Sequence, residues 1–197
     1  MLVAAVLLLC TPAVARANGD PASDYLLVQN VFLPFNGKID PDAAARLSDV
    51  IRAANQAGFR IKVAVIGSRY DLGTAFSLFK QPQRYAEFLG LELSFQYHDR
   101  LLVVMPSGYG YSANGKPNAA GIRVVKTLPA PGSDPTKEVE GATAAIRRLA
   151  AAEGHVLPAG GGESQTRDRL VIAAGATALV ALLAAIVFWR RRPGPTL

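Results

Sequence analysis

The side chains best suited to chemistry follow two predicted strands, at the point where each strand ends. The strands cover residues 60–66 and 101–105, and ligands of open α/β sheets bind beyond the carboxyl ends of strands. We therefore predict one ligand-binding rim that combines charges with aromatic surface. Its members are Arg69, Asp71, Ser107, Tyr109 and Tyr111. The simpler alternative is an exposed loop in which Asp71 caps the following helix.

Metal and catalytic chemistry have less support in the sequence. Asp71 and Asp99 are the candidate metal ligands, but a divalent cation prefers several carboxylates and the rim offers few. The two histidines, His98 and His155, do not belong to a cluster with zinc spacing, and no serine lies in a Gly-x-Ser-x-Gly turn. We therefore predict no catalytic residue. An enzymatic activity is suggested only by the resemblance to other proteins described below.

Residues 110–116 nearly match a phosphate-binding loop. The match fails because Pro117 stands where a serine or threonine would coordinate magnesium, and residues 118–121 do not resemble the start of a helix. We predict a solvated turn here, and no bound nucleotide.

The spacing of hydrophobic residues predicts alternating strands and helices. Asp40-Pro41 and Asp134-Pro135 each begin a helix, because the aspartate accepts backbone amide hydrogen bonds and proline fits the first turn. This order predicts an α/β domain with a central, largely parallel sheet and helices on its faces. The predicted elements are a strand over 25–33, a helix over 40–58, a strand over 60–66, a helix over 74–89 broken at Gln81-Pro82, a strand over 101–105, a weaker strand over 122–128 and a helix over 134–154.

A C-terminal segment has the length and composition of a transmembrane helix. Leu170 to Trp189 contains no charged residue, and about twenty helical residues cross the hydrocarbon core. Arg190, Arg191 and Arg192 follow directly, which predicts a cytoplasmic C-terminus. We therefore predict a span over 169–190 and a tail over 191–197.

The N-terminus resembles a secretory signal peptide. The apolar run from Leu2 to Leu9 precedes Ala15-Arg16-Ala17, a small-x-small cleavage site. We predict a signal peptide over 1–17, an N-terminal linker over 18–24, a folded domain over 25–156 and a Gly/Pro-rich linker over 157–168. Cys10 is the only cysteine, so the mature domain relies on a hydrophobic core rather than disulfides.

The charge of the protein lies mostly beside the predicted span and signal. The formal net charge is +6, but residues 18–166 hold 15 basic and 14 acidic residues, a net charge of +1. A net charge this small gives no support for a basic surface that binds the phosphate backbone of nucleic acid. We therefore predict no nucleic-acid partner.

Several segments between residues 25 and 154 resemble the TPM domain family of exported, membrane-anchored bacterial proteins and thylakoid lumen proteins. The resemblance implies the α/β fold and, from some members, acid phosphatase activity and calcium or magnesium binding. This chain joins its third strand to Gly108-Tyr109-Gly110 directly through Pro106-Ser107, where the family usually has a hairpin. The similar segments are Asp40-Pro41-x-x-Ala44-x-x-Leu47, residues 58–66, Tyr85-Ala86, and residues 100–104 with 108–110.

These observations predict a single-pass, membrane-anchored domain outside the cytoplasm that acts as a binding or assembly module in the cell envelope. The predicted partners are the lipid bilayer and an envelope or membrane protein. The alternative function is that of a divalent-metal-assisted acid phosphatase.

Overall fold

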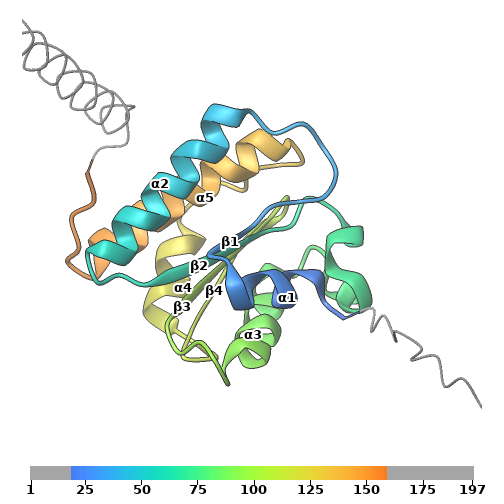
Figure 1. Ribbon diagram of the computed structural model, residues 1–197, viewed down its shortest axis with the longest axis horizontal. Helices are drawn as coiled ribbons and strands as arrows, with labels where there is room; N and C mark the ends of the chain where they lie inside the picture. The colour runs from blue at the N-terminus through green and yellow to red at the C-terminus, as the bar shows by residue number, and fades with distance from the viewer. Residues whose placement is uncertain (1–18, 159–197) are drawn as a thin grey trace, which may run out of the picture. The chain divides into compact units, whose positions relative to one another are not determined.

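Five strands form one sheet in the order β1-β2-β3-β4-β5, and helices cover both of its faces (Figure 1). The computed structural model describes residues 19–158. β1, β2 and β3 are parallel, whereas β4 runs antiparallel to β3 and to β5. The predicted α/β class is confirmed, but the sheet is mixed, and only its first three strands are parallel. The strands are β1 Val31–Phe32, β2 Ile61–Val65, β3 Arg100–Met105, β4 Gly108–Ala113 and β5 Lys116–Pro117.

The two faces of the sheet carry separate hydrophobic cores. On one face, α2 (Pro41–Gln56), α4 (Ala119–Lys126) and α5 (Pro135–Ala152) pack on Val63, Val65, Leu102 and Val104. On the other face, α1 (Pro21–Val28) and α3 (Pro82–Leu93) pack on Ala64, Ile66, Leu101 and Val103. This alternation explains why both central strands are apolar along nearly their whole length.

The two connections between the parallel strands have opposite hands. β1, β2 and β3 are neighbours in that order, yet α2 lies on one face between β1 and β2, and α3 lies on the other between β2 and β3 (Figure 1). Both connections step in the same direction across the sheet, but their helices lie on opposite faces, so the two crossovers have opposite handedness. One connection is therefore left-handed, which is rare among such crossovers.

Both predicted Asp-Pro helix starts are confirmed. Asp40 accepts a hydrogen bond from the backbone N–H of Asp42 at 2.9 Å, and Asp134 accepts one from Thr136 at 2.9 Å. α2 and α5 then lie side by side (Figure 1). Their position brings the first turn of α5 toward the carboxyl end of the sheet, where Gly67 adjoins Glu138.

The predicted strand over 25–33 is wrong, because residues 25–28 belong to α1 and only two of the others form a strand. Asp20 accepts a hydrogen bond from the N–H of Ala22, and Pro21 occupies the first turn, so this is a third Asp-Pro helix start. Ala22 and Leu26, one helical turn apart, are both fully buried against the sheet. Only Val31–Phe32 remain as strand.

The predicted weak strand over 122–128 is also wrong. Residues 119–126 form α4, contrary to the prediction that 118–121 do not begin a helix. The side chain of Asn118 caps this helix by accepting a hydrogen bond from the N–H of Gly121 at 2.9 Å. Gly121 is required there, because a Cβ atom would lie 2.1 Å from the ring of Tyr111.

The segment predicted as one solvated turn over 110–116 belongs to two successive hairpins, which join β3 to β4 and β4 to β5. Pro106-Ser107 is the two-residue turn between β3 and β4, so this chain does have a hairpin there. Asn114-Gly115, with φ angles of 53° and 67°, then makes the turn into β5. The near match to a phosphate-binding loop therefore lies mostly on a strand.

The helix predicted over 74–89 is two elements. A 3₁₀ segment, η1, covers Arg69–Leu78 and bends at Gly73, and α3 begins at Pro82, after the predicted break. Gly73 adopts φ 51° and ψ −120°. A side chain there would also collide with the carbonyl oxygen of Gly19, at 2.3 Å from the added Cβ.

The predicted signal peptide, membrane span and tail lie outside the described residues, as does most of the C-terminal linker. Among residues 19–158, no helix has both the length and the apolar character needed to cross a bilayer.

Candidate functional site

Asp71 ties together two loops at the carboxyl ends of β1 and β2. Its Oδ1 accepts a hydrogen bond from the N–H of Phe35 at 2.9 Å, and its Oδ2 accepts bonds from the N–H and hydroxyl of Ser68 at 2.8 Å and 3.1 Å. The side chain is completely buried. The carboxylate therefore holds the rim together rather than facing a ligand. It also differs from the exposed loop that the sequence offered as the alternative, because Asp71 is buried within the first turn of η1.

Replacing Asp71 by alanine is expected to lower the free energy of unfolding by about 2 kcal/mol, because two backbone N–H groups would lose their acceptor. Ser68→Ala, which removes the hydroxyl bond alone, should cost less than about 1 kcal/mol. Urea unfolding of both variants measures the difference. Equal stabilities would contradict the role assigned to the carboxylate.

The predicted rim residues are not brought together as one site. Arg69 is exposed on η1 and its guanidinium lies 5.8 Å from the ring centre of Phe76, while Ser107 is exposed at the β3–β4 turn. Tyr111 belongs to the core cluster under α4 and α5, and the half-buried Tyr109 packs against this cluster. Burial raises the pKa of both phenols, and that of Tyr111 also rises beside Glu153.

The two candidate metal ligands lie at opposite ends of the sheet. Asp71 follows the carboxyl end of β2, whereas Asp99 precedes the amino end of β3 and pairs with Arg60 at 3.2 Å. Asp71 and Asp99 therefore do not share a metal site. Within residues 19–158, no group of three or more His, Cys, Asp or Glu side chains is arranged to hold an ion.

A second buried carboxylate at this rim was not anticipated. Glu138, in the first turn of α5, has no exposed surface, and neither of its oxygens has a hydrogen-bond partner among the described residues. Burial, together with the charges of Asp71 and Asp134, raises its pKa to about 8. The sequence does contain a signal: Glu138, Ala142, Ala145 and Leu149 recur at helical spacing, which places the glutamate on the buried stripe.

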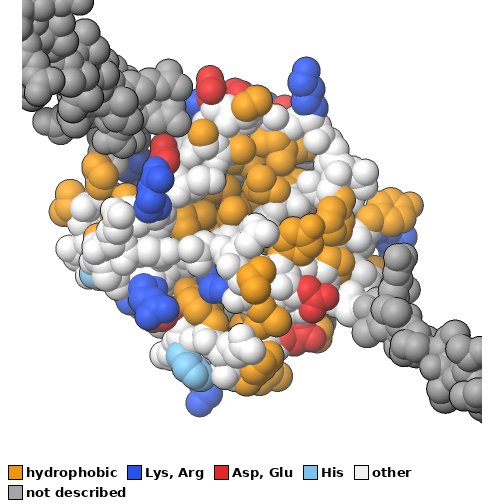
Figure 2. Space-filling view, in the orientation of Figure 1, with side chains coloured by type: hydrophobic (Ala, Val, Ile, Leu, Met, Phe, Trp, Pro, Cys, Tyr) orange, Lys and Arg blue, Asp and Glu red, His pale blue; other side chains and the backbone are white. Residues whose placement is uncertain are grey.

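Beside this rim is an open groove between α1 and η1, which we call the aromatic groove. Its volume is about 680 Å³. Three aromatic side chains in it are strongly exposed: Tyr25 at 45%, Tyr70 at 75% and Phe76 at 53%. Figure 2 shows hydrophobic side chains at the surface on the side of the molecule where α1 and η1 lie. The groove is lined by Pro21, Tyr25, Arg69, Tyr70, Gly73 and Phe76.

One wall of the aromatic groove is anchored to the sheet. The ring of Tyr25 contacts Phe32 of β1 edge-on, with ring centres 5.5 Å apart, and Phe35 contacts both rings. Edge-to-face contacts of this kind hold aromatic rings in defined orientations. These contacts fix the orientation of the Tyr25 ring in the wall, and Tyr25 itself remains partly exposed.

The groove also contains charge. Asp24 and Arg69 both line it, and no described carboxylate lies within ion-pair distance of Arg69. An incoming acidic group therefore has an available cation beside the aromatic surface. Sequence reasoning predicted Arg69 for this rim, but it missed Tyr25 because the segment was assigned to a strand.

Comparison with known protein families, curated proteins and solved structures finds no match to this chain. The resemblance to the TPM family therefore remains a prediction from the sequence.

Proposed function

We propose that this chain is an exported, single-pass membrane protein whose folded domain is a binding or assembly module of the cell envelope. The domain begins with α1 at Pro21 and not at the predicted residue 25, because Ala22 is buried in the core and the segment predicted as a linker over 18–24 contains the start of this helix. In this proposal the span over 169–190 holds the domain outside the cytoplasm. The aromatic groove binds an extended segment of another envelope or membrane protein. That segment would place apolar side chains between Tyr25 and Phe76 and an acidic group beside Arg69.

The observation that carries this proposal is the exposure of Tyr25, Tyr70 and Phe76 around one concave surface. Tyrosine, other aromatic residues and arginine are enriched in protein interfaces, and a few such residues in a pocket usually supply most of the binding energy. Exposing three aromatic rings to water is unfavourable in isolation. Covering them would recover that free energy.

A protein segment fits the groove better than a bilayer surface does. The charges of Asp24 and Arg69 in this open groove cancel, so the groove offers anionic headgroups no net attraction. An extended segment can enter a hollow and pair its own polar groups there. Recruitment to vesicles by the aromatic groove itself, lost when Tyr70 or Phe76 is replaced by alanine, would contradict the proposal.

The phosphatase alternative receives less support from the same region. It would draw on Asp71 as a ligand, but both oxygens of that carboxylate already accept hydrogen bonds from the protein. The side chain is also completely buried, so a metal could reach it only if the β1 and β2 loops moved apart. The binding module makes no such demand.

The test is a selection of displayed peptides on the full chain in detergent, followed by affinity measurements on the enriched peptides. We expect apolar peptides with an acidic residue, and we expect Phe76→Ala or Tyr70→Ala to weaken them about tenfold or more. Phe95→Ala is the matched control, because Phe95 is 69% exposed but does not line the groove.

The proposal fails if enriched peptides bind Phe76→Ala as tightly as the unchanged protein, or if no peptide is enriched. Metal-dependent hydrolysis of an aryl phosphate by the same protein, tested with calcium, magnesium and manganese, would favour the phosphatase instead.

A further inference from the structure

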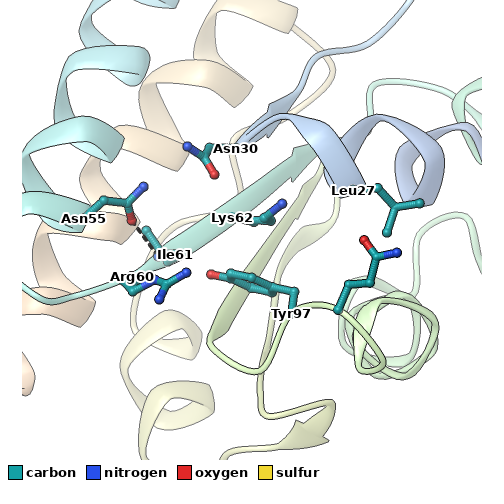
Figure 3. A pocket seen from close by; sticks show the side chains of 8 residues that line it. Leu27, Asn30, Asn55, Arg60, Ile61, Lys62 and Tyr97 are labelled. Atoms are coloured by element: carbon teal, nitrogen blue, oxygen red, sulfur yellow. Dashed lines mark hydrogen bonds between the residues drawn. The ribbon is translucent and has the colours of Figure 1, made fainter.

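A second pocket lies at the opposite end of the sheet, at the amino ends of β2 and β3. Its volume is about 340 Å³, and four separate segments of the chain contribute to it. Figure 3 shows Lys62 on β2 with Arg60 and Tyr97 beside it and Asn30 near the end of α1. We call it the Lys62 pocket; its polar and aromatic members are Asn30, Asn55, Arg60, Lys62, Gln96 and Tyr97.

Lys62 is a buried cation on a strand that is otherwise apolar. Its residue is 8% exposed, while Ile61, Val63, Ala64 and Val65 beside it are at most 1% exposed. The ammonium group lies 5.0 Å from the ring centre of Tyr97. Burying a charge is costly unless it is paired, so a lysine at this position calls for an explanation.

The described residues provide a hydrogen-bond acceptor for only one of the three N–H donors of the Lys62 ammonium group. Its Nζ donates a hydrogen bond to the carbonyl oxygen of Leu26, in the last turn of α1. An ammonium has three donors, and the described residues supply no other hydrogen-bond acceptor and no carboxylate within ion-pair distance. Capping α1 therefore accounts for one donor and leaves the charge unpaired.

Arg60 adds a second positive charge to the same pocket. Its Nε lies 3.2 Å from Asp99, which does not line the pocket. No acidic residue is among the lining residues, so the two cations face one neighbouring carboxylate. Both burial and the charge of Arg60 lower the pKa of Lys62, and a bound anion would oppose both effects.

The remaining lining residues suit a ligand with a polar head and a small body. The amide of Asn55 is held in place, because its Oδ1 accepts a hydrogen bond from the N–H of Ile61 at 2.9 Å (Figure 3). Asn30 and Gln96 are exposed and contribute further amide donors. Leu27 and the ring of Tyr97 provide apolar surface for an attached group.

We propose that the Lys62 pocket binds a small molecule or headgroup that carries an oxyanion, a phosphate or a carboxylate, between Lys62 and Arg60. The oxyanion supplies the negative charge that the described residues do not place beside Lys62. This site is separate from the aromatic groove, because it lies at the amino rather than the carboxyl end of the parallel strands. It does not depend on the function proposed above.

Calorimetric titration of the full chain tests this proposal with phenylphosphonate and benzoate, which share one body and differ in the oxyanion. We expect at least one of them to bind, and Lys62→Met to weaken that binding about tenfold or more. Methionine keeps an unbranched apolar side chain and removes the charge, so it is compatible with the buried strand. Lys38→Met, at an exposed position outside the pocket, is the control and should bind as the unchanged protein does.

Short-chain phosphatidic acid, added to the full chain in detergent with short-chain phosphatidylcholine as the control, distinguishes a lipid source from a soluble one. Binding of the soluble probes with loss in Lys62→Met supports the proposal, and so does binding confined to phosphatidic acid with the same loss. Unchanged binding by Lys62→Met overturns it, as does the absence of binding to every probe. If sodium chloride at the same ionic strength gives the same calorimetric signal as the probes, the signal comes from screening of charges, and this result also overturns the proposal.

Discussion

Glu138→Gln is expected to stabilise the protein by about 3 kcal/mol above pH 8 and to change its stability little below about pH 4.5. Glutamine keeps the size and shape of the protonated side chain. It cannot ionise, so the variant should lose the pH dependence that this buried carboxyl imposes on folding.

The sign follows from the direction of the pKa shift. The carboxyl of Glu138 ionises near 4.5 in the unfolded chain and near 8 in the folded protein. Between these values the unfolded chain has released its proton and the folded protein has not, so stability falls as the pH rises. The full shift, from 4.5 to about 8, corresponds to about 5 kcal/mol, and we expect about 3 kcal/mol because structural relaxation reduces the penalty for burying charge.

Urea unfolding across this pH range, with the unchanged protein and the variant measured side by side, provides the test. Asp20, whose pKa burial raises to about 6, adds a dependence of the same sign to both proteins, and this cancels in the difference. Glu140→Gln is the matched control, since Glu140 lies on the same helix, is 54% exposed and pairs only loosely with Arg46 at 3.6 Å. Two parallel curves for Glu138→Gln and the unchanged protein would contradict the assignment.

Two helices could be predicted from the sequence because each begins with an Asp-Pro pair. A third Asp-Pro pair, at the start of α1, was not recognised as a helix start. Asp20-Pro21 begins α1 as Asp40-Pro41 and Asp134-Pro135 begin α2 and α5. The residues after it, from Tyr25 to Leu33, are rich in β-forming side chains, which favoured a strand. The cap and the burial of Ala22 and Leu26 outweigh that local preference.

Only those residues of the candidate site that directly follow a predicted strand could be located from the sequence. Arg69 and Asp71 lie in the first turn of η1, shortly after the end of β2, as the chain order implies. The burial of Tyr111 and the partial burial of Tyr109 follow from the pairing of β4 with β3, which periodicity did not reveal because glycines alternate with the tyrosines there. Lys62 was treated as an ordinary member of a strand, because nothing local distinguishes a lysine whose amine meets α1 from one that reaches solvent.

Deletion of residues 167–197 is expected to move the protein completely from the membrane fraction to the soluble extracytoplasmic fraction. The deletion removes the proposed span and its arginines, and it leaves all the described residues in place. About twenty apolar residues bind a bilayer far more strongly than any surface contact of the domain would.

Deletion of residues 193–197 alone is the matched control, because it keeps Leu170 to Trp189 and all three flanking arginines. This shorter deletion should remain in the membrane fraction and resist extraction with alkaline carbonate. Protease added outside intact cells should digest the domain of the full chain while a tag placed after Leu197 stays protected, since the arginines favour the cytoplasmic side. If the longer deletion still sediments with membranes, the groove or another part of the domain holds the protein there, and the proposed span is not its anchor.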